Sequence, residues 1–406
     1  MGQLRGIQMK NIYLDNAATT RVAPEVLNVM IPYFIKIYGN PSEYHKMGMD
    51  SRKAIEEARG KIAGFLGTKA ETIIFTSCAT ESINLSHKGL IEAMGNKFPR
   101  KVRPHIITSS VEHKAVLETC HSLERKGKAS ITYLPVDRFG RVEVESVEQA
   151  VSRDTVLISI MYVNNEVGTI QPINEIGQLV QRLNQNRKNP VYYHTDATQA
   201  LGFLDCNVDN LGVDLLSFTG HKINAPKGIG VLYIREGVEI KRQIDGGNQE
   251  KRLRAGTENT PYIVGLAKAV ELVNIRKNNK VRKLTSFRNI LIKELLKIPG
   301  VKLTGDPEKR VPHIVSVIVN GVEGEGAVLY LSELGIYASS GSACTSTDLA
   351  ASHVLTAMGY SESESHGSIR FSMCDKTKKQ DINYLVSEFP KVVEKLRKMN
   401  PIYNEK

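Results

Sequence analysis

The stretch Leu215-Leu-Ser-Phe-Thr-Gly-His-Lys222 joins a short apolar run to a polar turn that ends in a lysine. A short apolar run bounded by turn residues predicts a buried strand. A lysine at the end of a strand, beside small and polar residues, can form a Schiff base with an aldehyde cofactor. A lone lysine at a turn is more often only an exposed side chain, so Lys222 has to be judged together with the rest of the chain.

Six further strand-like segments lie on both sides of this stretch, at residues 72–76, 105–109, 131–135, 156–161, 191–194 and 230–234. Amphipathic helical stretches separate several of them. Alternation of strands and helices is typical of a mostly parallel sheet that is covered by helices. We therefore expect an α/β fold with a seven-stranded sheet, in which ligands bind at the carboxyl ends of the strands.

The pattern changes after Pro261. A long basic helical stretch reaches about Lys297, a strand-like segment follows at 314–319, and a last helix is expected near 380–399. A chain of 406 residues is long for one domain. We expect a large domain over residues 16–264 and a smaller α+β domain made of residues 1–15 and 265–406.

Composition and charge argue against a membrane protein, a disulfide-rich protein and a nucleic-acid-binding protein. No apolar stretch is long enough to span a bilayer, and residues 1–10 lack the apolar core of a signal peptide, so we expect a cytoplasmic protein without a membrane partner. The five cysteines include no C-x-x-C pair, which argues against a disulfide framework or a metal site. The net charge is +11, but few aromatic side chains lie among the lysine runs, so direct nucleic-acid binding is not expected. An acidic protein partner or an anionic cofactor suits this charge better.

Two polar side chains follow the predicted strand at 191–194. Asp196 can pair with a protonated pyridine nitrogen, which makes such a ring an electron sink. Gln199, one turn later, could hydrogen-bond the ring hydroxyl. The simpler alternative is that Asp196 only caps the next helix.

Polar residues also follow the strands at 72–76 and 105–109. The stretch Thr76-Ser-Cys-Ala-Thr-Glu-Ser82 offers hydroxyls and backbone N–H groups at a helix start, which suits a phosphate, although a plain helix cap is an equally consistent reading. His113 opens a helix after the second strand and could stack on a pyridine ring and move protons. A lone histidine at such a position is more often a cap.

The stretch Ala338-Ser-Ser-Gly-Ser-Ala-Cys-Thr-Ser346 surrounds one cysteine with small residues. Almost no apolar side chains accompany Cys344, so packing does not explain it. We expect a mobile loop that carries an exposed thiol, which as a thiolate could reach both a substrate and an outside acceptor. The alternative is a flexible linker with an incidental cysteine.

Taken together, the motifs resemble those of the NifS/IscS family of cysteine desulfurases. These are pyridoxal 5′-phosphate (PLP) enzymes with the aspartate-aminotransferase-like fold (type I). The resemblance runs from Tyr13 to Ser372, and the loop around Cys344 looks like that of the long-loop class. The matching segments are residues 13–20, 39–42, 112–114, 163–168, 196–199, 220–222, 254–259, 340–345 and 368–372.

The resemblance implies a catalytic role for three residues. Lys222 matches the lysine that carries PLP and moves the Cα proton of the substrate. Cys344 matches the cysteine that accepts sulfur as a persulfide. His113 matches a histidine that stacks on the cofactor ring and exchanges protons with the thiols.

The resemblance also implies the binding residues. Arg370 would clamp the substrate carboxylate through its guanidinium fork, and Asn165 would lie near that carboxylate and the cofactor. Thr257 would reach the cofactor phosphate of a neighbouring subunit, which implies a homodimer. The remaining cofactor contacts would be Asp196 and Gln199 at the ring, and Ala79, Thr80, Thr219 and His221 at the phosphate.

The implied activity is conversion of L-cysteine to L-alanine. Sulfur on Cys344 would pass to acceptor proteins such as an iron–sulfur scaffold, or to thio-cofactor or tRNA biosynthesis. The alternatives are a selenocysteine lyase or another PLP-dependent lyase or aminotransferase. A non-enzymatic scaffold on the same fold is disfavoured because both Lys222 and Asp196 are present.

Three residues stand where the family commonly has glycine, namely Cys78, Arg252 and Cys374. Loss of a glycine near a tight turn raises the question of backbone strain. None of the three changes removes a catalytic group. We expect Cys78 to be a structural substitution and not a second sulfur acceptor.

Overall fold

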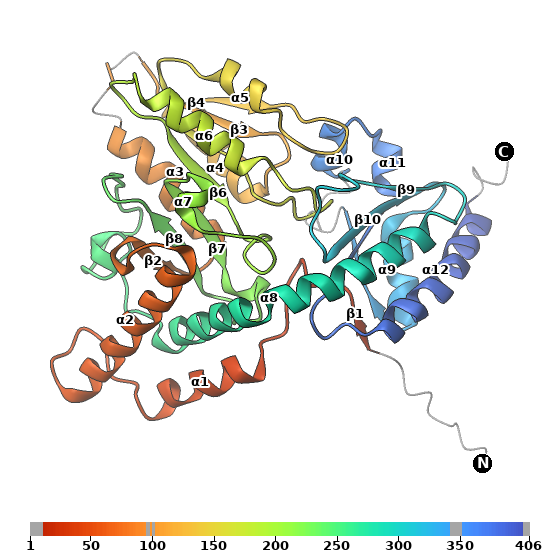
Figure 1. The fold of residues 1–406 in the computed structure, drawn as a ribbon, viewed down its shortest axis with the longest axis horizontal. Coiled ribbons are helices and arrows are strands. Elements are labelled where there is room, and N and C mark those ends of the chain that lie inside the picture. The colour runs from red at the N-terminus through yellow and green to blue at the C-terminus, as the bar shows by residue number, and fades with distance from the viewer. Residues whose placement is uncertain (1–10, 95–97, 100–101, 342–350, 401–406) are drawn as a thin grey trace.

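A seven-stranded sheet and a four-stranded sheet lie side by side in the computed structural model, which describes residues 11–94, 98–99, 102–341 and 351–400. The long helix α8 (Thr260–Leu295) runs from one sheet to the other across the lower part of Figure 1. The predicted boundary between residues 264 and 265 falls inside this helix, and the division into two domains stays a prediction.

The large sheet has seven strands in the order β2-β8-β7-β6-β5-β3-β4. Only β8 runs antiparallel to its neighbours, so the mostly parallel, seven-stranded sheet is confirmed. Strands that are buried on both faces tend to be continuously apolar, as β8 is, and β7 is buried throughout although it contains Ser217 and Thr219. The strands are β2 (Ile73–Thr76), β3 (His105–Ser109), β4 (Ser130–Leu134), β5 (Thr155–Ser159), β6 (Tyr192–Asp196), β7 (Leu215–Thr219) and β8 (Gly230–Ile234).

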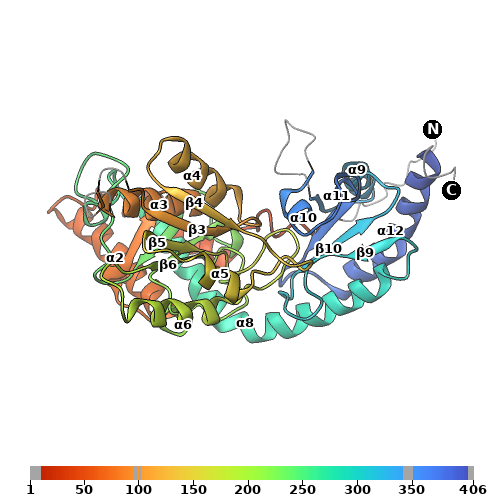
Figure 2. The same ribbon diagram turned by 90° about the horizontal axis from the view of Figure 1, so that it is seen from above.

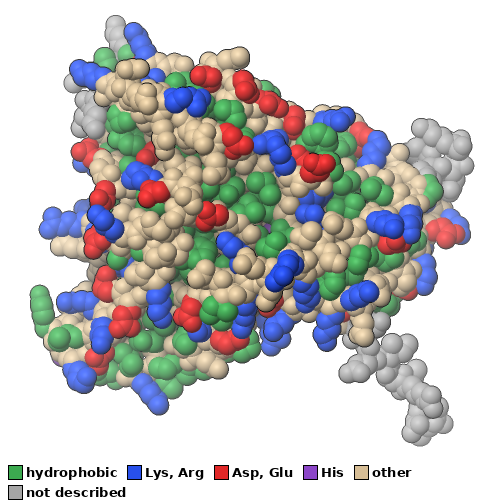
Figure 3. Space-filling model, in the orientation of Figure 1, with side chains coloured by type: hydrophobic (Ala, Val, Ile, Leu, Met, Phe, Trp, Pro, Cys, Tyr) green, Lys and Arg blue, Asp and Glu red, His purple; other side chains and the backbone are tan. Residues whose placement is uncertain are grey.

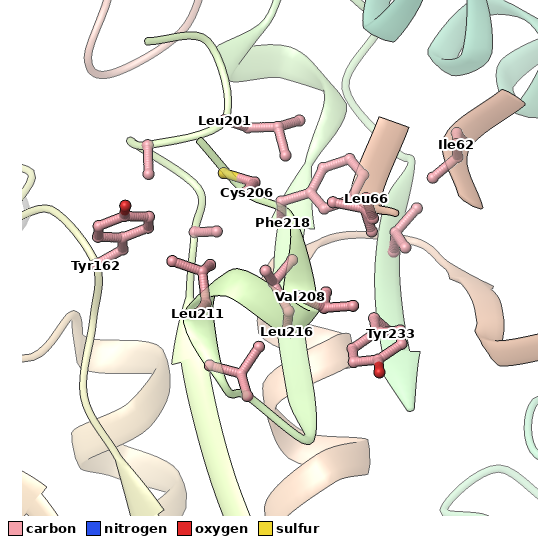
Figure 4. Close-up of a cluster of buried hydrophobic side chains, with 14 of the residues drawn as sticks. Ile62, Leu66, Tyr162, Leu201, Cys206, Val208, Leu211, Leu216, Phe218 and Tyr233 are labelled. Atoms are coloured by element: carbon pink, nitrogen blue, oxygen red, sulfur yellow. The ribbon is translucent and has the colours of Figure 1, made fainter. Parts of the chain in front are cut away.

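Helices cover both faces of this sheet. Figure 2 shows α3 and α4 over one face and α6 and α8 against the other. Successive side chains of β7 point to opposite faces of the sheet, so they belong to two apolar cores. Leu215 packs under α3, and Leu216 and Phe218 pack on the opposite face. Figure 4 shows the second core, where Phe218 and Leu216 meet Leu66 and Val208. The helices are α2 (Lys46–Leu66), α3 (Ala79–Met94), α4 (Lys114–Arg125), α5 (Val144–Ala150), α6 (Ile173–Asn184) and α7 (Val208–Leu211).

The small sheet has four antiparallel strands in the order β12-β13-β10-β9 and its own apolar core. A short strand from the start of the chain, β1 (Ile12–Tyr13), pairs in parallel with β11 (Ile336–Tyr337) and joins that core through Ile12 and Leu14. The strands are β9 (Val301–Leu303), β10 (Ile314–Val319), β12 (Ser339–Ser340) and β13 (Ser368–Ser372). The helices beside them are α9 (Gly324–Glu333), α10 (His353–Ala357), α11 (Glu362–His366) and α12 (Lys379–Met399).

Residues 15–20 lead from β1 to the large sheet, and α1 (Pro24–Ile35) follows beside α8. This segment therefore passes between the two sheets. Within the described ranges, no helix is both long enough and apolar enough to cross a membrane.

Candidate active site

The site forms where strands of the large sheet end. β6 and β7 pair in parallel with Asp196 opposite Ser217, and the turn Gly220–Lys222 follows β7 directly. Gly230 pairs with both Thr76 of β2 and Thr219 of β7. A Cβ atom on Gly230 would lie 2.5 Å from the carbonyl carbon of Cys78, so only glycine lets the loop after β2 approach so closely. The predicted phosphate-binding stretches therefore lie next to each other.

Lys222 lies at the centre of this arrangement. Its ammonium group donates hydrogen bonds of 2.6 Å to the carbonyl oxygens of Ala17 and Ala18. The side chain is half-buried. The backbone between the two sheets thus fixes the position of the amine.

Arg370 approaches the same segment from the small sheet. It lies within β13, and its guanidinium donates to the carboxylate of Asp15 at 2.9 Å and to the backbone carbonyl of Asn165 at 2.8 Å. Its Nε–H is buried without a partner among the described residues. The site thus brings a fixed guanidinium, Asn165 and the Lys222 amine together around residues 15–18.

Asp196 is the last residue of β6 and is buried. Its Oδ1 accepts the backbone N–H of Thr198 at 2.9 Å, and no bond to Oδ2 occurs among the described residues. Oδ1 of Asp196 can therefore cap the backbone while Oδ2 stays available for a cofactor. Gln199 donates to the Ala17 carbonyl at 2.9 Å, and its Oε1 lies 3.3 Å from Nε2 of His313.

His113 is the N-cap of α4, where its Nδ1 accepts the backbone N–H of Ala115 at 3.1 Å. This bond leaves the proton of the neutral ring on Nε2. The ring is exposed at the open site, yet surrounding protein atoms lower its pKa by desolvation, and Lys222 and Lys114 act in the same direction. The charge of Asp196 opposes this shift. The ring is therefore neutral near pH 7, as a proton acceptor requires.

The predicted phosphate contacts surround the first turn of α3. Ala79 begins this helix and the side chain of Thr80 is exposed. The Thr219 hydroxyl donates to the carbonyl of Ile229 at 3.0 Å. His221 contacts the Thr19 hydroxyl through Nδ1 at 3.2 Å, and desolvation, helped by Lys222, lowers the pKa of His221 to about 4. Hydroxyls, a neutral imidazole and a helix N-terminus form a donor set that fits a phosphate.

Thr257 lies on the exposed segment before α8. It lines a cavity of about 240 Å³ together with Thr76 and Ser77. Arg252, on the same segment, has a φ of 66°, whereas Cys78 and Cys374 do not have positive φ. Of the three positions where the family commonly has glycine, only Arg252 thus occupies the left-handed region that favours glycine.

Cys344 lies outside the described residues. The residues before and after its segment can be placed at the site. Ser339 in β12 pairs with Arg370, and His353, which begins α10, contacts the backbone carbonyl of Glu112 through Nε2 at 2.9 Å. Ser352 donates to the carboxylate of Glu166, beside Asn165.

The sequence patterns did not predict a place in the site for Glu112 or Asp15. Glu112 is fully buried, and its Oε1 accepts the Ser109 hydroxyl at 2.7 Å and the Met161 N–H at 2.8 Å. Its Oε2 has no partner among the described residues. Burial, with a contribution from Asp196, raises the pKa of Glu112 to about 8. The sequence does show a glutamate next to His113, but no local pattern indicates that this glutamate is buried.

The comparisons with known proteins agree with this geometry. The family model described as aminotransferase class-V matches residues 12–385. A cysteine desulfurase IscS from Methanosarcina thermophila is 46% identical over 99% of this chain and 96% of that protein. Another, from Dictyoglomus turgidum, is 45% identical over 98% of each.

Solved structures show the same relationship. A NifS-like protein superposes with a TM-score of 0.87 and 38% identity, covering 95% of this chain and 99% of that one. SspA in complex with cysteine superposes with a TM-score of 0.78 and 36% identity, covering 90% and 99%. These findings confirm the expected fold and the dependence on PLP. The chain belongs to the class-V aminotransferase family and, within it, to the cysteine desulfurases.

Proposed function

We propose that this chain removes the sulfur of L-cysteine, leaves L-alanine, and carries the sulfur as a persulfide on Cys344. The observation that carries the proposal is the contact of residues 15–18 with the Lys222 amine and the Arg370 guanidinium. Ala17 and Ala18 bind the amine of Lys222, and Asp15 binds the guanidinium of Arg370. An amino acid has one carboxylate and one reacting Cα, and the site offers a cation for the first and a base for the second.

The donor set fits PLP. When bound, PLP supplies an aldehyde for Lys222 and an electron-withdrawing ring. Asp196 would hold a protonated pyridine nitrogen through Oδ2, and Gln199 the ring oxygen. The start of α3 with Ala79 and Thr80 would hold the phosphate, together with the Thr219 hydroxyl and His221.

The residues of this chain then have separate tasks. Arg370 and Asn165 orient the substrate carboxylate, and Lys222 takes the Cα proton on Nζ. His113 is neutral and can take a thiol proton only on Nδ1, which must first release the backbone N–H of Ala115, whereas its Nε2–H can donate a hydrogen bond to the sulfur. The Cys344 thiolate attacks the substrate sulfur, so that an S–S bond forms as the C–S bond breaks. The electron pair of that bond goes to the carbon side, and protonation there completes alanine.

We infer a homodimer from two surfaces. Thr257 is exposed, and the apolar side chains of Leu27, Ile31, Phe34 and Ile35 on α1 are 43–64% exposed. Apolar residues gathered on one helix mark an interaction surface. A second copy would cover them and bring its Thr257 to the neighbouring phosphate site.

The sulfur acceptors are proteins such as an iron–sulfur scaffold, and the reaction belongs in the cytoplasm. A reducing compartment suits an enzyme that works with free thiols. The described cysteines, Cys78, Cys120, Cys206 and Cys374, are all free, which supports this placement.

The test measures alanine and sulfide formed from L-cysteine by the wild type and by Cys344→Ala. We expect the variant to keep the colour of bound PLP and to form neither product above background. Unchanged alanine formation by the variant would contradict the role of Cys344. A variant that is active on L-selenocysteine alone would instead favour a selenocysteine lyase.

A further inference from the structure

A second cavity lies on the other side of the segment that holds Lys222. Its volume is about 770 Å³, which is the size of a pocket for a small molecule. Asn16 and Thr19 line it, whereas Lys222, His113, Asp196, Gln199 and Arg370 do not. It is therefore separate from the candidate active site although the same segment borders both.

The walls of this cavity combine apolar and basic side chains. Val22, Ile223, Leu272 and Val273 supply apolar surface. The cavity is lined by more cations than carboxylates, and the carboxylates are those of Glu25, Asp375 and Asp381. Figure 3 shows lysine and arginine side chains along the course of α8 on this face. The cations are Arg21, Lys227, Arg276, Lys280, Lys376 and Lys378.

Lys280 is a partly buried cation of this cavity that lies over an aromatic ring. Arg276 is paired with Glu25 at 2.6 Å, but no hydrogen bond or ion pair joins the Lys280 ammonium to any described residue. Its Nζ lies 4.1 Å above the centroid of the Phe203 ring. Burial lowers the pKa of Lys280, and Asp375 and Cys374 oppose the shift. An ammonium group in such surroundings gains from an anion placed beside it.

Two stacked rings, those of Phe203 and His313, connect Lys280 to the candidate active site. The Phe203 ring is stacked on His313, with the centroids 3.8 Å apart and the planes at 5°. His313 in turn contacts Gln199, which binds the carbonyl of Ala17. The cavity thus borders residues that hold the cofactor side of the site in place.

We propose that this cavity binds a small organic anion with an apolar part, and that Lys280 contacts its acidic group. The apolar wall takes the hydrocarbon portion, and the excess of cations favours a carboxylate, sulfonate or phosphate over a neutral molecule. Cys374 lines the same cavity and is partly exposed, so its thiol reports on occupancy. This proposal does not depend on the sulfur chemistry proposed above.

The first test uses the full chain loaded with PLP and the fluorescent anion anilinonaphthalene sulfonate. Site-resolved mass spectrometry follows alkylation of Cys374 by iodoacetamide with and without saturating probe. We expect the probe to slow alkylation of Cys374 by about tenfold or more. The rate at Cys78, which does not line the cavity, should stay unchanged. An unchanged rate at Cys374, or equal slowing of both thiols, would overturn the proposal.

The second test compares probe affinity among matched variants by fluorescence titration. Lys280→Met removes the charge and keeps the length of the side chain, and we expect it to weaken binding about tenfold. Lys293→Met removes the same charge from an exposed position of α8 outside the cavity and should bind as the wild type does. Lys376→Met changes an exposed residue of the cavity wall, so it decides the question if Lys280→Met does not fold. Equal affinity in the wild type and the folded cavity variants would contradict the proposal.

Discussion

His113 shows how one backbone contact can set the tautomer of a histidine ring. The N–H of Ala115 occupies Nδ1, so the proton of the neutral ring is on Nε2, and desolvation together with Lys222 keeps the pKa below its ordinary value of 6.5. The neutral ring can therefore take a thiol proton only on Nδ1, and the bond from the Ala115 N–H must open first. The cap and the proton-acceptor role use the same ring nitrogen, so in the structure they can only alternate.

The pH profile of kcat/KM should reflect this lowered pKa. The neutral form is the active one, so activity is retained above the pKa of His113 and falls as the pH drops through it. We expect the acidic limb below pH 6.5. We expect His113→Gln to lower kcat/KM by about 10²–10⁴-fold and to remove that limb. An acidic limb that persists in the variant would assign it to another group.

Glu112 should make stability depend on pH in a defined direction. Its pKa is raised from 4.5 to about 8, so the folded protein holds a proton that the unfolded chain releases over that interval. Stability is therefore fully present below about pH 4.5 and is lost as the pH rises toward 8.

Glu112→Gln imitates the protonated acid and keeps both hydrogen bonds to its oxygen. We expect this variant to be more stable than the wild type at pH 8 by roughly 1–3 kcal/mol, and to show a flatter pH dependence in urea unfolding. The two proteins should converge near pH 5. Parallel pH curves for the two would show that Glu112 is ionised in the folded state.

At the scale of elements, a buried ion pair holds the segment that leads to Thr257. Glu250, Lys251 and Arg252 all have positive φ, which is costly for residues other than glycine. Arg59 of α2 binds both carboxylate oxygens of Glu250 at 2.8 and 2.9 Å, and the N–H of Phe75 donates to one of them. This contact ties the segment to α2 and to β2.

Breaking this buried ion pair should lower the free energy of unfolding more than breaking an ion pair on the surface. We expect Glu250→Ala to lower the free energy of unfolding by about 3–5 kcal/mol, because Arg59 would remain buried without its partner. Lys69→Ala breaks an exposed pair with Glu236 and should cost at most about 1 kcal/mol. Urea unfolding of both variants, with Arg59→Ala and the double variant, measures the coupling. A coupling energy near zero would contradict this account.

Local patterns predict the strands and the residues that follow them, because burial and turn chemistry are local properties. Lys222, Asp196 and His113 follow or end apolar runs, and their approximate places could be predicted. The pairing of Arg370 with Asp15 spans 355 residues and that of Arg59 with Glu250 spans 191, so no local pattern reveals them. The raised pKa of Glu112 depends on burial in the folded chain, which no local pattern reveals either.

At the scale of the whole molecule, the proposed homodimer makes a prediction that one chain alone does not. If Thr257 serves the cofactor of the partner subunit, Lys222→Ala and Thr257→Ala chains damage different sites. A mixed dimer then contains one site with both residues intact. We expect mixing and reassembly of the two variants to restore about a quarter of the wild-type activity, because about half of the dimers are mixed and each of these has one intact site of two. Activity no higher than the sum of the separate variants would place Thr257 at its own subunit's cofactor.

The central claim is that Lys222 and Cys344 act in sequence on one substrate. The most direct measurement is peptide mass spectrometry of the PLP-loaded enzyme after a single turnover with L-cysteine, without an acceptor or reductant. The account predicts one extra sulfur atom on Cys344 for each alanine formed in the wild type. It predicts no extra sulfur on any cysteine in Lys222→Ala. Extra sulfur on Cys78 or Cys374 in place of Cys344, or alanine formed without any protein-bound sulfur, would contradict it.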